Sequence, residues 1–205
     1  MGGLAIEAIG DRTVSDRAPR LCLVFAPGSR PDLAALDTLV SKTRDAGLPD
    51  FAVSHRSPDQ LWAELLADGL TFDCTGLAPG PFDPQPPAGP PVGLRAMPAG
   101  EVVCLAPGPH LAGAAGLVPV LRILAGVGAR LATLPGAKAI VWTPAGSWVS
   151  PDLFQRVTRD WLDSGAFPAL VLAALERERN GAMVSRGLSL LIGQEVRFEP
   201  DKRIP

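Results

Sequence analysis

The chain of 205 residues is poor in the side chains that most metal and redox sites use. It contains two histidines, three cysteines and no tyrosine. No C-x-x-C or H-x₃-H pair occurs, although structural zinc sites are usually built from such spacings. We therefore expect no metal ion and no disulfide framework. Cys22, Cys74 and Cys104 each lie in an apolar stretch and are predicted to be reduced core residues.

Clustered positive charge is also missing. The net charge is −2, and Lys and Arg are scattered rather than interleaved with aromatics. Because a phosphate backbone is bound by dense positive charge, we expect no nucleic-acid partner. Residues 1–17 lack the basic start and apolar block of a signal peptide, which favours a cytoplasmic location. The apolar segment Leu111–Leu131 has the length of a membrane span, but Arg122 at its centre and Pro119 within it favour a buried helix in a soluble protein.

Glycine and proline, by contrast, are abundant at 22 residues each. Short glycine patterns therefore arise by chance, and "CLAPGPHLAGAAG" (104–116) has to be judged on its chemistry. A phosphate-binding loop needs a Lys followed by Ser or Thr, which this stretch lacks, and it fails the Gly-x-Gly-x-x-Gly spacing of dinucleotide sites. Cys104 lies inside a predicted strand, which disfavours a Cys104–His110 nucleophile and base. We interpret the stretch as a structural turn, with no bound cofactor.

Hydrophobic periodicity predicts five elements before residue 78. The run 20–25 reads as a strand buried on both faces, and 70–75 alternates like a half-buried strand. Ser57-Pro58-Asp59-Gln60 has the composition of a helix capping box. The predicted order is strand 20–25, a helix from Pro31 to Gly47, strand 51–55, a helix from Ser57 to Gly69, and strand 70–75.

A similar order follows in the second part of the chain. The predicted elements are strand 101–106, helix 111–131, strand 137–142, a helix from Ser150, strand 169–175, and a last strand within 187–200. Both second helices would begin with Ser-Pro-Asp, which favours an internal duplication. The predicted fold class is α+β, with two related β-α-β-α-β halves of ferredoxin-like character and an extra C-terminal strand completing the second sheet. The expected parts of this one compact body are a loose N-terminal segment (1–19), the first half (20–77), a Pro/Gly-rich connector (78–100) and the second half (101–205).

The connector leaves two interpretations open. Its P-x-x-P spacings, Pro84 to Pro87 and Pro87 to Pro90, could dock into an aromatic groove of a partner. A stiff strap that lies along the surface is the alternative, and it is the one we favour.

Four residues are candidates for ligand binding. Arg186 could present its guanidinium to a carboxylate, and Glu195 could act as a base or as the partner of that arginine. Trp148 lies in a predicted loop, where it could line a pocket or fasten the following helix. His110 completes the set. No catalytic residue is assigned, because no nucleophile elbow, paired-acid motif or metalloprotease motif occurs.

The second part of the chain resembles a bacterial domain family of unknown function. The resemblance covers mainly residues 100–200, in which "GAKAIVWTPAGSWVSPDLF", "FPALVLAAL" and "SRGLSLLIGQEVRFEP" carry it. Ser185 stands near a Thr of the family pattern, and Leu191 or Ile192 near a Phe. The resemblance implies an α+β protein of two related halves and implies no activity. The matching positions are Gly136, Ala137, Ala139, Val141, Trp142, Pro168, Gly187, Leu188, Gly193 and Glu195.

The sequence thus favours a non-catalytic binding or interaction module, and an exposed strand edge would allow it to associate as a homo-oligomer. The alternative is a small-molecule-binding protein or enzyme with a cleft between the two halves, around the four candidate residues.

Overall fold

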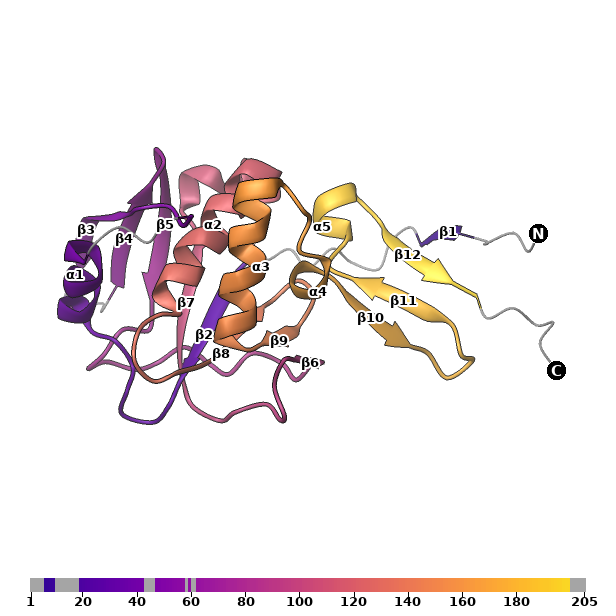
Figure 1. The fold of residues 1–205 in the computed structure, drawn as a ribbon, viewed down its shortest axis with the longest axis horizontal. Coiled ribbons are helices and arrows are strands. Elements are labelled where there is room, and N and C mark those ends of the chain that lie inside the picture. The colour runs from indigo at the N-terminus through magenta and orange to yellow at the C-terminus, as the bar shows by residue number, and fades with distance from the viewer. Residues whose placement is uncertain (1–5, 10–18, 43–46, 58, 60–61, 200–205) are drawn as a thin grey trace.

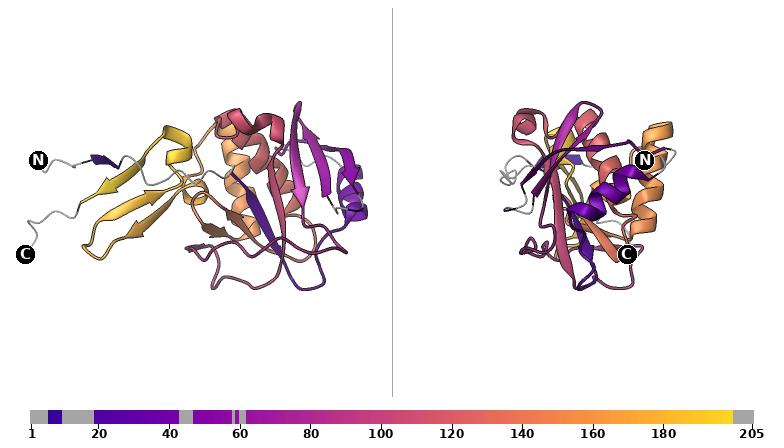
Figure 2. Two further views of the ribbon diagram at one scale, coloured as in Figure 1. Left: turned by 180° about the vertical axis from the view of Figure 1, so that it is seen from behind. Right: turned by 90° about the vertical axis from the view of Figure 1, so that its left-hand side faces the viewer.

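The computed structural model describes residues 6–9, 19–42, 47–57, 59 and 62–199. These residues form an α+β body around one large sheet, and a smaller sheet projects beyond the end of that body (Figures 1 and 2). We call the smaller sheet the arm.

The large sheet has the order β3-β4-β5-β7-β2-β8-β9-β6. Its strands are antiparallel except for the β6–β9 pair. The strand bounds are β2 (Leu21–Phe25), β3 (Ala52–Ser57), β4 (Trp62–Ala67), β5 (Leu70–Thr75), β6 (Pro91–Val92), β7 (Glu101–Pro107), β8 (Ala137–Trp142) and β9 (Ser147–Val149).

Strand β2 lies in the middle of this sheet. All five of its residues are buried, as the continuous apolar run 20–25 predicts. Leu21 lies opposite Leu105 of β7 on one side and opposite Trp142 of β8 on the other. A strand from the first part of the chain is therefore sandwiched between two strands from the second part.

One face of the sheet is covered by helices. The helix bounds are α1 (Leu33–Ser41), α2 (Val118–Leu131), α3 (Pro151–Ser164), α4 (Ala169–Leu172) and α5 (Ser189–Ile192). Helices α2 and α3 pack against each other and against the central strands (Figure 1). Two glycines of α2 allow close packing: a Cβ on Gly126 would lie 2.4 Å from Pro49 Cδ, and one on Gly128 would lie 2.7 Å from Leu21 Cδ1. Glycine in these positions serves helix packing.

The other face of the sheet is covered by the connector 78–100, which we call the strap. A small second core lies beneath it and contains Cys22, Val24, Val102, Cys104, Ala139, Val141 and Trp148, with Leu94 of the strap packed against them. The Asp83 amide donates to Val102 O at 3.1 Å, and β6 of the strap pairs with β9. A Cβ on Gly89 would lie 2.0 Å from Gly146 O, so the strap passes very close to the β8–β9 turn.

The predicted helix from Ser57 to Gly69 is wrong. Ser57 ends β3, Pro58 and Gln60 lie outside the described residues, and 62–67 form β4. Leucines spaced at 61, 65 and 66 fit a helix, but burial alternates with period two along β4. Asp68 and Gly69 both have positive φ, 47° and 78°, which is the geometry of a tight Asp-Gly hairpin turn. That turn signal decides the local structure.

The strand predicted at 169–175 is also placed wrongly. Residues 169–172 form α4, and the strand β10 (Ala174–Arg177) begins after it. The helix predicted over 111–131 divides into a 3₁₀ helix (Pro109–Ala114) and α2, because Pro119 suits only a first helical turn.

The last strand of the chain, β12 (Glu195–Phe198), belongs to the arm rather than to the large sheet. The arm has the order β1-β12-β11-β10, with β1 at Ile6–Ile9 and β11 at Met183–Arg186. Four residues of the predicted loose N-terminal segment therefore form a strand, and residues 1–5 and 10–18 lie outside the described part. The arrangement as two β-α-β-α-β halves is not confirmed, because β4 replaces a helix of the first half and β2 pairs with strands of the second.

Candidate functional site

The four candidate ligand residues lie in separate surroundings. His110 is exposed on the 3₁₀ helix, and its Nε2 lies 3.3 Å from Thr71 Oγ1 of β5. Trp148 is in β9 beneath the strap, whereas Arg186 and Glu195 belong to the arm. The structure therefore brings Arg186 and Glu195 into the same small sheet and places the other two elsewhere.

Trp148 fastens the strap. Its ring is 4% exposed within the second core, and its indole Nε1 donates to Pro87 O at 3.0 Å. The predicted alternatives were a pocket wall or contact with the following helix. In the structure the indole holds the strap against the sheet.

Arg186 pairs with Glu176 of β10 rather than with Glu195. The two side chains are 41% and 50% exposed, and a Cβ on Gly146 would lie 3.9 Å from either terminal nitrogen of Arg186. The guanidinium thus lies where the arm meets the β8–β9 turn, with its charge already partnered.

The Glu195 carboxylate is surrounded by donors from residues 185–189, which run from the end of β11 to the start of α5. Oε1 accepts hydrogen bonds from the amides of Gly187 and Ser189, at 2.9 and 3.0 Å, and from Ser189 Oγ at 2.7 Å. Oε2 accepts from Ser185 Oγ at 2.6 Å and from the Leu188 amide at 3.3 Å. Partial burial by itself raises the pKa of Glu195, but the bonds from Ser185, Ser189 and Gly187 outweigh it and hold the pKa below its usual value.

These contacts give Glu195 a structural role. A carboxylate that accepts five hydrogen bonds and remains ionised is a poor general base. It holds the turn between β11 and β12 in one conformation, and Ser185 Oγ extends the network by accepting from the Val196 amide at 2.7 Å.

Asp73 of β5 is a titratable group that the sequence did not single out. Burial is the main cause that raises its pKa, a hydrogen bond from Trp62 lowers it, and the nearby Glu64 raises it further. Glu64 lies directly opposite Asp73 on β4, and Asp73 Oδ1 is buried without a hydrogen-bond partner among the described residues. The alternation of 70–75 does place Asp73 on the more exposed face, but a helix at 62–67, as the sequence predicts, would not place Glu64 opposite it.

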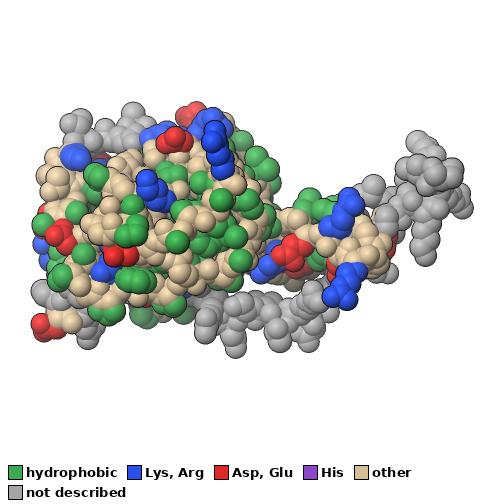
Figure 3. Space-filling view, turned by 90° about the horizontal axis from the view of Figure 1, so that it is seen from below, with side chains coloured by type: hydrophobic (Ala, Val, Ile, Leu, Met, Phe, Trp, Pro, Cys, Tyr) green, Lys and Arg blue, Asp and Glu red, His purple; other side chains and the backbone are tan. Residues whose placement is uncertain are grey.

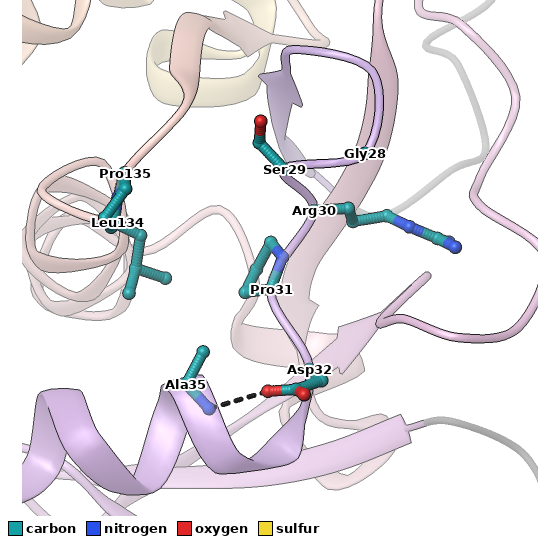
Figure 4. Close-up of a pocket in the computed structure, with 8 residues that line it drawn as sticks. All are labelled: Gly28, Ser29, Arg30, Pro31, Asp32, Ala35, Leu134 and Pro135. Atoms are coloured by element: carbon teal, nitrogen blue, oxygen red, sulfur yellow. Dashed lines mark hydrogen bonds between the residues drawn. The ribbon is translucent and has the colours of Figure 1, made fainter.

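A depression of about 280 Å³ lies between the start of α1 and the residues after α2. Its wall contains Pro31, Ala35, Leu134 and Pro135 (Figure 4). Asp32 is occupied as the N-cap of α1, where its Oδ1 accepts from the Ala35 amide at 2.8 Å. Ligand pockets usually gather a few converging polar groups. The wall also contains Ser29 and Arg30, but the Arg30 guanidinium donates to Gly76 O at 2.7 Å and to Gly80 O, and this side chain points away from the depression (Figure 4). The small-molecule alternative therefore gains no support from this depression and stays a prediction.

Among the described residues, no group of three or more His, Cys, Asp or Glu is placed to hold a metal ion. No described helix is both long enough and apolar enough to cross a membrane.

The arm has two different faces. Strand register places Leu175, Arg177, Met183, Ser185 and Phe198 on one face, which we call the apolar face, and Val196 joins them by alternation along β12. The opposite face carries ion pairs, Arg186 with Glu176 and Arg197 with Glu178 and Glu199. Charged side chains on the arm are visible in Figure 3. Leu175 is 57% exposed, and Met183, Val196 and Phe198 are half-buried.

Exposed apolar side chains gather around the base of the arm. Nine large apolar side chains are exposed in the described part of the chain. Four of them lie on the arm or on the segment that joins it to the body, namely Phe167, Leu170, Leu175 and Ile192, and two more, Leu117 and Val118, lie at the start of α2. The start of α2 adjoins α5, since a Cβ on Gly116 would lie 3.0 Å from Leu190 O. Helix α4 leads directly into β10. Such clustering marks an interaction surface more often than isolated exposed leucines do.

Comparison of the chain with protein-family models, with curated proteins and with solved structures gave no match. The resemblance of residues 100–200 to a bacterial family of unknown function stays a prediction.

Proposed function

We propose that this protein is a non-catalytic interaction module that binds a second copy of itself through the arm and its base. The observation that carries the proposal is the concentration of exposed apolar side chains there, six of nine among the described residues. The charged candidates for chemistry, Arg186 and Glu195, are already engaged in ion-pair or hydrogen-bond contacts within the arm.

The architecture of the arm supports a second layer of protein. A small antiparallel sheet is stable when one face is packed against another layer. No described helix lies over the arm as α2 and α3 lie over the large sheet (Figures 1 and 2). A partner that covers the apolar face would supply the missing layer.

A second copy of the chain fits this face. Two-fold association brings the same surface of each copy together, so an apolar face meets an apolar face. Leu175, Met183 and Phe198 would then interdigitate with their counterparts, as in packed sheets. Arg177, which is exposed near the tip of β10, would stay in solvent at the rim.

The proposal is tested by measuring mass with size-exclusion chromatography and light scattering over a range of concentrations. We expect the wild-type chain of 21.4 kDa to reach twice that mass as concentration rises. Leu175→Glu and Leu170→Glu should shift it towards the monomer, because each places a charge in the apolar interface. Both side chains are more than half exposed, so neither change removes core packing.

Leu66→Glu is the matched control. Leu66 is 39% exposed on β4, at the end of the large sheet away from the arm (Figure 1). The Leu66→Glu chain should dimerise as the wild type does. A wild-type chain that stays monomeric at every concentration, or a Leu66→Glu variant that dissociates as readily as Leu175→Glu, would refute the proposal.

A further inference from the structure

Two of the three cysteines face each other across neighbouring strands. Cys22 of β2 lies directly opposite Cys104 of β7, and both side chains belong to the second core beneath the strap. They are 4% and 2% exposed. Cys74 belongs instead to the helix-covered core on the other face of the sheet.

Backbone hydrogen bonds define the geometry of this pair. The Thr143 amide donates to Arg20 O at 3.1 Å, so the alternation of an antiparallel ladder turns the N–H and C=O of Cys22 towards β8. The Gly108 amide donates to Thr71 O at 2.9 Å, and the same alternation turns the N–H and C=O of Cys104 towards β5. Because the backbone N–H and C=O groups of both cysteines point away from the other strand, Cys22 and Cys104 form a non-hydrogen-bonded pair.

A pair of this kind has the spacing that a disulfide needs. Directly opposed residues in non-hydrogen-bonded positions have Cα atoms about 4.5 Å apart and side chains that approach closely. Disulfides span Cα separations of about 4.4–6.8 Å. Oxidation would therefore require little movement of β2 or β7.

We propose that Cys22 and Cys104 form an oxidation site that a peroxide converts to a cross-strand disulfide in the folded protein. The thiolate of one cysteine attacks a peroxide oxygen, which gives a sulfenic acid and releases water once the leaving oxygen takes up a proton. The second thiolate then attacks the sulfenic sulfur and displaces the hydroxyl group as water. In sum, two thiols and one hydrogen peroxide give one disulfide and two water molecules.

The strap controls access to the pair. Leu94 packs over the second core, and Trp148 ties the strap to the sheet through its bond to Pro87 O. A hydrogen bond with Cys22, together with burial, raises the pKa of the Cys104 thiol far above its usual value. Oxidation is therefore slow while the strap is in place, and opening of the strap determines its rate.

The test is peroxide treatment of the reduced, folded chain, followed by denaturation, alkylation of the remaining thiols and mass spectrometry after trypsin. The three cysteines fall in different tryptic peptides, 21–42, 57–95 and 96–122. We expect peptide 21–42 joined to 96–122, while Cys74 in 57–95 remains a free, alkylated thiol.

Variants separate this outcome from general oxidation. Cys74→Ala should leave the cross-link intact, and Cys22→Ala should abolish it. Trp148→Phe keeps an aromatic ring but removes the bond to Pro87 O, and it should speed cross-linking several-fold. The oxidised chain should also melt at a higher temperature than the reduced one, because the bond closes the long loop between residues 22 and 104.

Several results would overturn the inference. One is that all three cysteines are still alkylated after prolonged exposure to peroxide, and another is that Cys22 and Cys104 are found as separate sulfinic acids. A cross-link that involves Cys74, or a cross-link between two chains, would also overturn it.

Discussion

Replacing Glu195 by glutamine tests whether this carboxylate holds the arm together or is available to a ligand. The change is nearly isosteric, but it removes the negative charge and replaces one acceptor oxygen with an amide that can only donate. Wherever that amide lies, at least one backbone amide, from Leu188 or from Gly187 and Ser189, loses its acceptor. A hydrogen bond to a charged group contributes about 1.5–3 kcal/mol.

The expected loss of about 2 kcal/mol corresponds to a fall in Tm of about 4–8 °C for a chain of this size. Thermal unfolding followed by circular dichroism at pH 7 measures it. Glu176→Gln is the matched control, because the Glu176–Arg186 pair is about half exposed, and such surface pairs contribute at most about 1 kcal/mol.

The difference in Tm between the wild type and Glu195→Gln should depend on pH, and the lowered pKa of Glu195 gives its direction. The folded state lowers the pKa of Glu195, so the unfolded chain takes up the proton first as the pH falls. The stability contributed by Glu195 is complete above the unfolded pKa and is lost as the pH falls through the folded pKa. Glutamine does not titrate, so the difference in Tm between the two proteins should become smaller below about pH 4.3. Equal melting temperatures at pH 7, or a gap that widens in acid, would refute the structural role of Glu195.

Two further substitutions test how the body is held together. Arg130 of α2 is 4% exposed, pairs with Asp50 at 2.6 Å and donates to Leu39 O. Because Arg130→Met removes both contacts, it should lower the free energy of unfolding, measured by urea denaturation, by about 2 kcal/mol. An unchanged midpoint of the urea transition would contradict this. Gly89→Ala places a Cβ 2.0 Å from Gly146 O, and displacement of the strap should cost about 1–3 kcal/mol. The Trp148 and Ser150 amides, which donate to Pro90 O and Val92 O of the strap, should then exchange hydrogen faster; wild-type exchange there would show that the strap is not closely seated.

The parts of the fold that could be predicted are those in which local pattern and final environment agree. The apolar run at 20–25 is a fully buried strand, and Pro151 begins a helix that Gly165 ends in the left-handed conformation. The turn interpretation of 104–116 agrees with a strand that leads into a 3₁₀ helix. In these segments the signals for beginning, period and end all point to the same element.

The predictions fail where two signals compete. Leu61, Trp62, Leu65 and Leu66 suit a helix, but the Asp68-Gly69 turn makes a hairpin, and the cross-strand contacts of β4 with β3 and β5 outweigh helix propensity. The sequence offers Arg186 as a partner of Glu195, but three of the five donors to this carboxylate are backbone amides of a turn whose shape no side-chain pattern reveals. The cross-strand cysteine pair depends on register between strands some eighty residues apart, which a single sequence does not encode locally.

The central position of β2 has a consequence for synthesis on the ribosome. Residues 21–25 leave the exit tunnel before both of their neighbours, β7 and β8, which come from 101–142. Until residue 101 has emerged, the nascent chain therefore carries this apolar strand with neither edge paired, and such unpaired apolar edges are prone to aggregate. The large sheet can close only after β8 has emerged, and the pairing of β1 with β12 must wait until residues 195–198 have emerged.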